Sequence, residues 1–314
     1  MAPAVKIVQP LTLKERLESW WHGLSFAYRS QWSWATALAD RRTYHEPDQM
    51  AQRLLLDCWP TDAFTMEEQR AIEAQEERLL ATYHLEPFKE KCNQVRYSDT
   101  LAYVVFLEAL FPSPPFLLWN KLSTEEKPID WLDVGCKNWS YLQALIVFSE
   151  VTHPNPSQAF AFMGIELDHR RLYLDGFTRG AHGRGYAKSS QTDRSQCTYQ
   201  GGDAMAHTGH YDVITSFLPF IIPEPCLDWG LPLSYLQPQA FLAHLVSLLK
   251  PGGCLLVMNQ GADEYAIQAD LLDPYLQETH PILRLDWTGE MPVTPWAYEE
   301  TRYGWRLIKL QESL

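Results

Sequence analysis

The second half of the chain carries small and acidic residues at the ends of short apolar runs. Asp133 and Gly135 close the first run, WLDVG, and Glu166 closes the run AFAFMGIE, 31 positions after Gly135. A glycine lets a ligand approach the backbone, and the N–H groups at the start of a following helix attract an anion. A carboxylate at the tip of the next strand can accept hydrogen bonds from both hydroxyls of a ribose. The pattern therefore indicates a site for an anionic group and a ribose.

Three further features follow in order. CTYQGGDAM places Asp203 just beyond a short strand, where its carboxylate could accept a hydrogen bond from an adenine amino group. The apolar run YDVITSFLPF opens onto Ser216 and Phe217, and FLAHLVSLLKPGGCLLVMN combines an amphipathic helix, a Pro-Gly-Gly turn and a buried strand. Each feature alone is common in α/β proteins, but the order and spacing of all five together are specific.

The elements that would position these residues alternate from Ile129 onward. Short apolar runs that end in Gly or Asp are each followed by a helical pattern, which is typical of β-α units around a parallel sheet. Two later runs, PILRLDWTG and RYGWRLIKL, suit a terminal antiparallel pair. We expect a doubly wound α/β fold whose ligands bind at the carboxyl edge of the sheet. The expected strands lie near residues 129–134, 159–165, 196–200, 211–217, 254–259, 281–289 and 302–310.

Residues 1–125 are expected to form a helical segment that packs over that edge of the sheet. The run TMEEQRAIEAQEERLLATYHLEPF begins with a capping box from Thr65 to Glu68. Ser98 and Asp99 are expected to cap the next helix, TLAYVVFLEALF. That helix is apolar nearly all round and should therefore be buried between other elements.

Two compositional features bear on which parts of the chain are exposed. The crowding of tryptophans in the first 125 residues indicates either an aromatic substrate pocket or a small helical core, and the core is the preferred interpretation. The segment GFTRGAHGRGYAKSSQTDRS is rich in glycine and basic residues and is expected to be an exposed connection. Its Arg179, Arg184 and Lys188 could bind an acidic partner. The tryptophans concerned are Trp20, Trp21, Trp32, Trp34, Trp59 and Trp119.

These motifs together resemble those of the class I S-adenosylmethionine-dependent methyltransferases over residues 129–310. The resemblance rests on LDVGC, GIELD, GGDA, YDVITSF and LLKPGGCLLV. It implies a Rossmann-like, seven-stranded, mostly parallel sheet with a reversed final strand, and S-adenosylmethionine across the carboxyl ends of the first and fourth strands. The residues that it implies as cofactor-binding are Asp133, Gly135, Cys136 and Lys137 at the methionine moiety, Glu166 and Leu167 at the ribose, Asp203 and Ala204 at the adenine, and Ser216 and Phe217 at the sulfonium side.

One departure from the family pattern concerns its first motif, which usually continues with further glycines. This chain has Lys137 and Trp139 at those positions. The lysine could pair with the carboxylate at the methionine end of the cofactor, obstruct the cofactor, or point into solvent. A nicotinamide cofactor is the weaker alternative, because it would require GxGxxG after the first strand and an acid about 20 residues later, and neither is present.

The overall composition disfavours several classes of protein. The net charge is −13 and neither half of the chain is a basic platform, which argues against a nucleic-acid partner. The six cysteines are scattered without a CxxC pair, which fits a reducing cytosol. His207 and His210 lack a third ligand, so no metal site is expected. We expect a cytoplasmic protein, because the sequence offers neither a signal peptide nor a membrane span.

The sequence thus predicts methyl transfer from S-adenosylmethionine to a small or medium-sized acceptor. Residues 126–314 would form the methyltransferase domain and residues 1–125 its helical cap. Residues near 97–119 and the stretch from Phe220 to Trp229 are expected to close over an apolar or aromatic acceptor. Two alternatives stay open: a non-catalytic S-adenosylmethionine-binding scaffold or sensor, and methylation of a protein that docks on the helical segment. The sequence predicts no catalytic residue and no oligomeric state.

Overall fold

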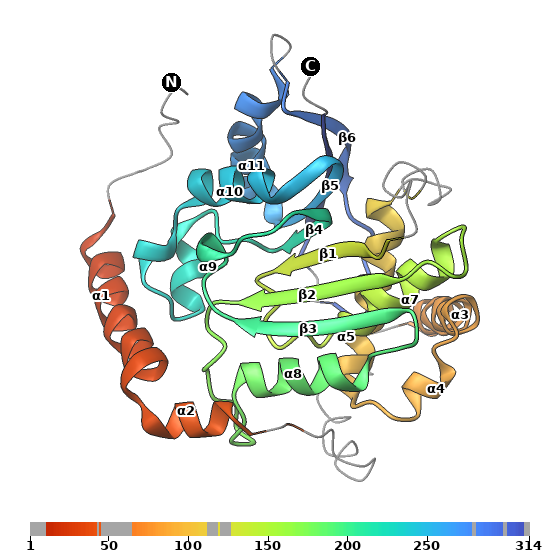
Figure 1. The fold of residues 1–314 in the computed structure, drawn as a ribbon, viewed down its shortest axis with the longest axis horizontal. Coiled ribbons are helices and arrows are strands. Elements are labelled where there is room, and N and C mark those ends of the chain that lie inside the picture. The colour runs from red at the N-terminus through yellow and green to blue at the C-terminus, as the bar shows by residue number, and fades with distance from the viewer. Residues whose placement is uncertain are drawn as a thin grey trace.

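A seven-stranded sheet forms the centre of the protein in the computed structural model, which describes residues 11–42, 44, 65–111, 119, 127–277, 281–297 and 300–310. The strand order is β3-β2-β1-β4-β5-β7-β6. Strands β1 to β5 pair in parallel, and β7 runs antiparallel to both β5 and β6 (Figure 1). The predicted sheet with a reversed final strand is therefore confirmed. The strands are β1 (Ile129–Val134), β2 (Phe160–Glu166), β3 (Ser195–Gly201), β4 (Tyr211–Phe217), β5 (Leu249–Gln260), β6 (Leu283–Glu290) and β7 (Arg302–Lys309).

Helices cover both faces of this sheet, as a doubly wound fold requires. One buried cluster joins one face of the sheet to α3, α5 and α7, and a second joins the other face to α10 and α11. Neighbouring residues of a strand alternate between the two clusters, as Trp131 and Leu132 do, because strand side chains point to opposite faces in turn. The helices are α1 (Leu13–Ala27), α2 (Trp34–Asp40), α3 (Met66–Tyr83), α4 (Glu86–Lys89), α5 (Gln94–Leu110), α7 (Leu142–Thr152), α8 (Arg179–Ser189), α9 (Pro223–Asp228), α10 (Pro238–Leu248) and α11 (Gly261–Leu276).

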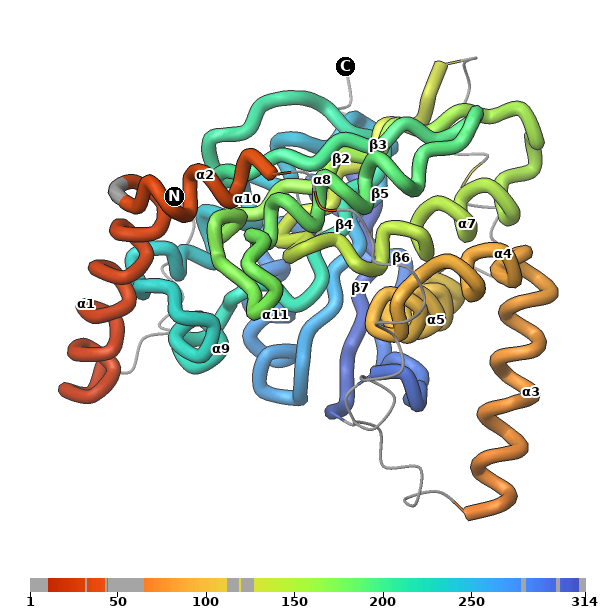
Figure 2. Tube along the Cα trace, turned by 90° about the horizontal axis from the view of Figure 1, so that it is seen from below, coloured from red at the N-terminus to blue at the C-terminus, as the bar shows by residue number. Residues whose placement is uncertain are grey.

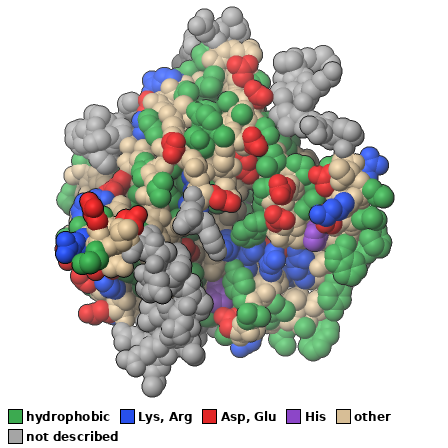
Figure 3. All heavy atoms as spheres, turned by 180° about the vertical axis from the view of Figure 1, so that it is seen from behind, with side chains coloured by type: hydrophobic (Ala, Val, Ile, Leu, Met, Phe, Trp, Pro, Cys, Tyr) green, Lys and Arg blue, Asp and Glu red, His purple; other side chains and the backbone are tan. Residues whose placement is uncertain are grey.

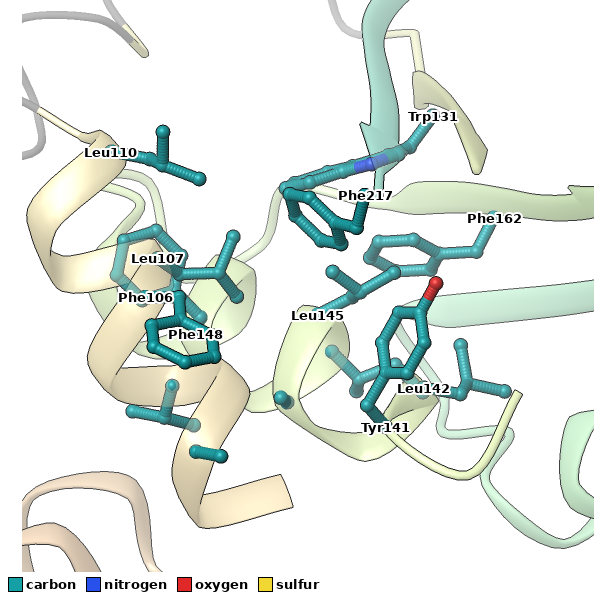
Figure 4. Close-up of a cluster of buried hydrophobic side chains, with 14 of the residues drawn as sticks. Phe106, Leu107, Leu110, Trp131, Tyr141, Leu142, Leu145, Phe148, Phe162 and Phe217 are labelled. Atoms are coloured by element: carbon teal, nitrogen blue, oxygen red, sulfur yellow. The ribbon is translucent and has the colours of Figure 1, made fainter. Parts of the chain in front are cut away.

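The first of these clusters ties the N-terminal half of the chain to the sheet. Figure 4 shows Phe106, Leu107 and Leu110 of α5 facing side chains of α7 and the aromatic rings of the strands. The indole Nε1 of Trp131 donates to Thr215 Oγ1 over 3.1 Å, so its polar atom is satisfied within the core. The helix α5 therefore shares a core with the sheet. The boundary between residues 125 and 126 stays a prediction.

Two helix starts were predicted, and one of the two predictions is wrong. Thr65 and Glu68 form the expected capping box at the start of α3. Helix α5 begins earlier than expected, because Asn93 is its N-cap and accepts a hydrogen bond from the backbone N–H of Arg96. Ser98 and Asp99 consequently lie inside the helix. Asparagine is as good a cap as serine or aspartate, so the cap signal alone could not decide between these starts.

The middle of the glycine-rich segment 176–195 forms the packed helix α8 (Arg179–Ser189), so the predicted exposed connection is wrong for these residues. Thr178 caps α8 by accepting from the N–H of Ala181 over 3.0 Å. A Cβ on Gly183 would lie 2.2 Å from the ring of Tyr199 on β3. The glycines therefore allow α8 to lie directly against the sheet, which larger residues would prevent.

The tryptophans of α1 and α2 form neither a core nor a pocket. Trp20, Trp21 and Trp34 are 65%, 64% and 78% exposed, whereas Trp119 is fully buried in the main core. Helix α1 lies at the outer edge of the molecule, at the opposite end from α3 (Figure 2). The preferred helical core is therefore wrong for these three residues. Trp59 and the side chain of Trp32 lie outside the described part of the structure.

The surface shows no simple division by charge on the face drawn in Figure 3, where acidic and basic side chains are interspersed with hydrophobic ones.

Among the described helices, none is both long and apolar enough to cross a bilayer. In Figure 1 the arrows of β1, β2 and β3 point toward α9 and α1. This is the carboxyl edge of the sheet, where the sequence predicts the ligand site.

Candidate active site

A cavity of about 1860 Å³ opens at the carboxyl edge of the sheet. Residues at or just beyond the ends of four parallel strands line it: Gly135 after β1, Glu166 on β2, Asp203 after β3 and Ser216 on β4. Sites for drug-sized ligands occupy roughly 300–1,000 Å³. The cavity is therefore large enough for a nucleoside cofactor and a second small molecule.

The structure brings eight of the ten predicted site residues to this cavity. The two exceptions are Asp133 and Cys136, whose side chains are fully buried behind the lining. Both helical segments that were expected to close over the acceptor also contribute, α5 through Asp99 and Tyr103 and the later stretch through Trp229. The eight residues are Gly135, Lys137, Glu166, Leu167, Asp203, Ala204, Ser216 and Phe217.

The carboxylate of Asp133 fixes the tip of β1. Its Oδ1 accepts from Thr215 Oγ1 over 2.7 Å, and its Oδ2 accepts from Trp139 Nε1 over 2.8 Å. Burial raises the pKa of Asp133 to about 6, although hydrogen bonds oppose this rise. The residue thus holds the surrounding backbone in place, and the expected contact with the methionine moiety would have to come from its neighbours. Burial likewise raises the pKa of the Cys136 thiol.

Lys137 and Trp139 adopt backbone conformations that normally favour glycine. Their φ angles are 56° and 60°, in the left-handed region, which costs a non-glycine residue roughly 1–2 kcal/mol. The ring of Trp139 packs under β2, where a Cβ on Gly164 would lie 2.8 Å from it. The backbone at Lys137 and Trp139 therefore has the left-handed conformation that glycines at these two positions would adopt easily. Strained backbone of this kind is concentrated at functional sites.

The side chain of Lys137 lies in the cavity. Its Nζ is 5.3 Å from the centre of the Trp229 ring, and the lysine is part of the cavity lining. The residue is at the same time exposed to solvent, so the pairing, obstructing and solvent-facing interpretations all stay predictions. Burial lowers the pKa of Lys137, and its Nζ makes no hydrogen bond to a described residue. An anionic ligand group in the cavity could pair with this ammonium.

Glu166 is the most heavily engaged carboxylate at the strand tips. Its Oε2 accepts from the backbone N–H of Lys137 over 3.0 Å. Its Oε1 accepts from the N–H of Asp168 over 2.9 Å and from Arg179 Nη1 over 2.8 Å. A carboxylate offers about four acceptor positions. One position on Oε2 is therefore left for a ribose hydroxyl, so only one of the two expected hydrogen bonds can form unless Arg179 moves.

Trp229 and Arg179 enclose this part of the cavity. The guanidinium of Arg179 lies 5.0 Å from the centre of the Trp229 ring, and the side chain of Arg179 is almost fully buried. The π-helical turn Tyr28–Trp32, which directly follows α1, supports the same region, because its Arg29 forms two hydrogen bonds of 2.8 and 2.9 Å with the buried carboxylate of Asp168. The segment after β4 is thereby held against the tip of β2.

The residues present fit S-adenosylmethionine. A Cβ placed on Gly135, whose φ is 75°, would meet nothing within 4 Å, so a ligand can approach its backbone. Asp203 lines the cavity and uses only its Oδ1 internally, for the N–H of Met205. Acidic residues outnumber basic ones in the lining, which suits a sulfonium cation. These are Asp99, Glu166, Asp203, Glu224, Asp228, Glu264 and Glu300 against Lys137, Arg179 and Arg302.

Several site residues were not singled out by the sequence or were assigned other roles. Arg179 was placed in an exposed connection, although Thr178 before it is a cap signal that could have indicated α8. Asp99 was taken for a helix cap, but it lines the cavity and accepts a hydrogen bond from Ser140. Arg302 carried no motif. His207, which was considered as a metal ligand, contacts the hydroxyl of Tyr211 through its Nε2 over 2.6 Å.

Replacing Lys137 by Met tests whether this lysine binds the ligand. The substitution keeps most of the volume and removes the charge, so we expect S-adenosylhomocysteine to bind more weakly, by up to about 3 kcal/mol. Calorimetric titration measures the change, and Lys188→Met on the exposed end of α8 serves as the matched control. Unchanged affinity would discard the pairing role, and tighter binding would show that the native lysine obstructs the site.

Known proteins resemble this chain in fold and not in sequence. No family model matches the chain, and no curated protein matches its sequence. A putative class I S-adenosylmethionine-dependent methyltransferase from Listeria monocytogenes is 15% identical, with 96% of this chain and 90% of that chain covered and a TM-score of 0.47. Magnesium protoporphyrin IX methyltransferase from Synechocystis PCC 6803 is 13% identical, with coverages of 63% and 78% and a TM-score of 0.39. N-methyltransferase NodS from Bradyrhizobium japonicum is 12% identical, with 62% of this chain and 85% of that chain covered and a TM-score of 0.38.

The fold itself is defined by the sheet of this chain. Its strand order, its parallel strands β1 to β5 and its reversed β7 are those that the sequence motifs imply. The cavity lies where the same motifs place the cofactor, across the ends of β1 and β4. The chain therefore has the fold of the class I S-adenosylmethionine-dependent methyltransferases.

Proposed function

We propose that this protein is an S-adenosylmethionine-dependent methyltransferase that acts on a small or medium-sized acceptor. The observation that carries the proposal is the order of residues along one edge of the sheet. Gly135, Glu166, Asp203 and Ser216 end four neighbouring strands and line one cavity. In this proposal the Gly135 backbone accommodates the methionine end, Glu166 accepts from a ribose hydroxyl and Asp203 accepts from the adenine amino group.

The bound cofactor would supply an electrophilic methyl group on a sulfonium centre. The residues of the chain then have to bind and orient the two molecules and to keep water away from them. Alignment can contribute a large part of the rate, and a general base is needed only if the accepting atom carries a proton. We therefore assign the lining residues to binding and orientation and name no general base.

The nature of the lining supports a small acceptor. Aromatic side chains of Tyr103, Phe106, Trp296 and Tyr303 border the part of the cavity nearest α5 and β7. Tyr103 stacks on Tyr141 with their ring centres 3.9 Å apart. Such a surface suits a flat, partly apolar molecule. The excess of acidic residues in the lining disfavours a nucleic-acid backbone.

Cofactor binding can be tested without knowledge of the acceptor. We expect calorimetric titration to show binding of S-adenosylmethionine and S-adenosylhomocysteine, and much weaker binding of NAD. The reason is that the strand-tip residues are present while the dinucleotide motif GxGxxG is absent. Clear binding of NAD together with no heat from either adenosyl compound would remove the proposal.

Methyl transfer distinguishes an enzyme from a cofactor-binding scaffold. The scaffold alternative has one observation in its favour, because the Lys137 side chain occupies part of the cavity at a position where glycine is expected. We expect the purified protein to transfer labelled methyl groups from S-adenosylmethionine to a low-molecular-weight component of a cell extract. Binding of the cofactor without transfer to any component would favour the scaffold.

A further inference from the structure

The strand order divides the cavity into two halves. Glu166 and Ser216 lie on β2 and β4, on either side of β1, whereas Gln260 and Arg302 lie on β5 and β7. Neighbouring strands are about 4.8 Å apart, so the tips of β4 and β7 are separated by about 10 Å across the sheet. If the cofactor occupies the half from β3 to β4, the half at β5 and β7 is left for the acceptor.

Arg302 is a cation in this second half whose side chain has no ion-pair partner in the described part of the chain. It opens β7 opposite Gln260, lines the cavity and is only partly exposed. Its Nε is inaccessible to solvent and has no hydrogen-bond partner among the residues that the structure describes. Its guanidinium makes no ion pair with a described residue and lies 5.2 Å from the centre of the Phe106 ring. Burial lowers the pKa of Arg302, so the present surroundings do not fully compensate its charge.

Other described arginines with a buried, unpaired Nε differ in one respect. Arg170 and Arg179 each donate a hydrogen bond from another guanidinium nitrogen, to Ser30 and Glu166 respectively. For Arg302 no such bond exists within the described residues. A buried guanidinium is costly unless an acceptor satisfies its donors, and its planar edge matches a carboxylate or a phosphate. The guanidinium therefore lacks the anion that it is suited to bind.

The residues around Arg302 restrict the shape of that anion. Phe106 lies beside the guanidinium, and Trp296 and Tyr303 also line this half of the cavity. The nearby carboxylates of Asp99 and Glu300 act against the lowering of the Arg302 pKa, but neither forms an ion pair with Arg302 among the described residues, and Asp99 accepts from the hydroxyl of Ser140. Aromatic walls around one cationic group suit a flat molecule that carries a negative charge at one end.

We propose, on the basis of the function proposed above, that Arg302 binds the carboxylate or phosphate of an aromatic acceptor. The anionic group lies at the tip of β7, and the accepting atom lies near Ser216 and Phe217, about 10 Å away across two strand spacings. The anion is consequently a recognition group that is separate from the atom that receives the methyl group.

The test compares matched probes on the intact protein saturated with S-adenosylhomocysteine. The probes are 4-hydroxycinnamate, its neutral amide, and phenyl phosphate, each titrated by calorimetry. Because only the anions can pair with the guanidinium, we expect at least one of them to bind about 10-fold or more tightly than the amide. The relative affinities of 4-hydroxycinnamate and phenyl phosphate show whether a carboxylate or a phosphate is preferred.

Two variants and one control assign the preference to Arg302. Arg302→Met should abolish the difference between anion and amide, and Arg302→Lys should keep only part of it, because lysine cannot form the paired hydrogen bonds. Arg284→Met removes a cation from β6 outside the cavity, where Arg284 pairs with Asp286 at 3.3 Å, and should behave like the parent protein. Since the side chain of Arg302 makes no hydrogen bond to a described residue, its replacement should leave the fold intact.

The outcomes separate this inference from the proposed function. Equal binding of anions and amide by the parent protein, no binding of either anion, or a preference that persists in Arg302→Met would each overturn the role of Arg302. If S-adenosylhomocysteine still binds in those cases, the proposed cofactor site stands. An anion preference that depends on Arg302 in a protein that does not bind S-adenosylhomocysteine would confirm the anion site and reject the cofactor.

Discussion

Glu166→Ala is expected to weaken S-adenosylhomocysteine binding and to destabilise the protein at the same time. The loss of affinity should be about 1.5–3 kcal/mol, or roughly 10- to 150-fold, because a charge-assisted hydrogen bond to the ribose is removed. The free energy of unfolding should fall by about 3–5 kcal/mol, because Arg179 then keeps a buried charge without its partner. The sequence alone predicts only the first effect.

A double variant separates the two consequences of this substitution. Glu166→Ala combined with Arg179→Met removes both charges, so we expect most of the folding stability to return while the cofactor affinity stays low. Denaturant unfolding and calorimetry measure the two quantities. Cofactor binding by Glu166→Ala at the strength of the parent protein would show that the tip of β2 does not hold the ribose.

Asp133→Asn is expected to change how stability depends on pH. Burial raises the pKa of Asp133 from 3.8 to about 6, so the folded protein holds this proton more tightly than the unfolded chain. The contribution of Asp133 to stability is therefore present below about pH 4, falls as the pH rises to about 6, and is constant above that. At about 1.4 kcal/mol for each tenfold change in proton affinity, the fall is about 3 kcal/mol.

The asparagine variant lacks this titration, and its amide can still accept from Trp139 Nε1. The unfolding free energy of Asp133→Asn minus that of the parent protein should therefore increase by about 2.4 kcal/mol between pH 4 and pH 7. Comparison at equal pH removes the contributions of other carboxyl groups, including Glu264, whose pKa burial also raises to about 6. A difference that does not vary with pH would mean that Asp133 is already ionised at pH 4 in the folded protein.

The strands could be predicted because their signals are local. Short apolar runs bounded by Gly or Asp mark each strand, and Thr65 with Glu68 marks the start of α3. The helix α8 could not be predicted in this way, since its glycines are compatible with a loop. Only the structure shows that a glycine is needed at position 183, because a Cβ there would clash with the ring of Tyr199 on β3. Local composition therefore predicts an element poorly where close packing against a distant element determines its residues.

The candidate site shows the same limit. Glu166 was identified from its position at the end of a strand, but its partner Arg179 and the neighbouring ring of Trp229 come from distant segments. The conformation of Lys137 was also not deducible, because a positive φ without glycine is stabilised by the surrounding structure. Arg302 is recognisable only when α5 and β7 are placed side by side. Strand tips thus follow from sequence, while the pairing of charges across the edge requires the fold.

A crystal structure with S-adenosylhomocysteine tests the central claim most directly. We expect the ligand at the tips of β1 to β4, with a ribose hydroxyl on Glu166, the adenine beside Asp203 and the homocysteine end along Gly135. The half of the cavity beside Arg302 should stay available for the acceptor. Ligand density in the half at β5 and β7 instead, or an adenosine ring in contact with Arg302, would contradict the assignment of the cavity.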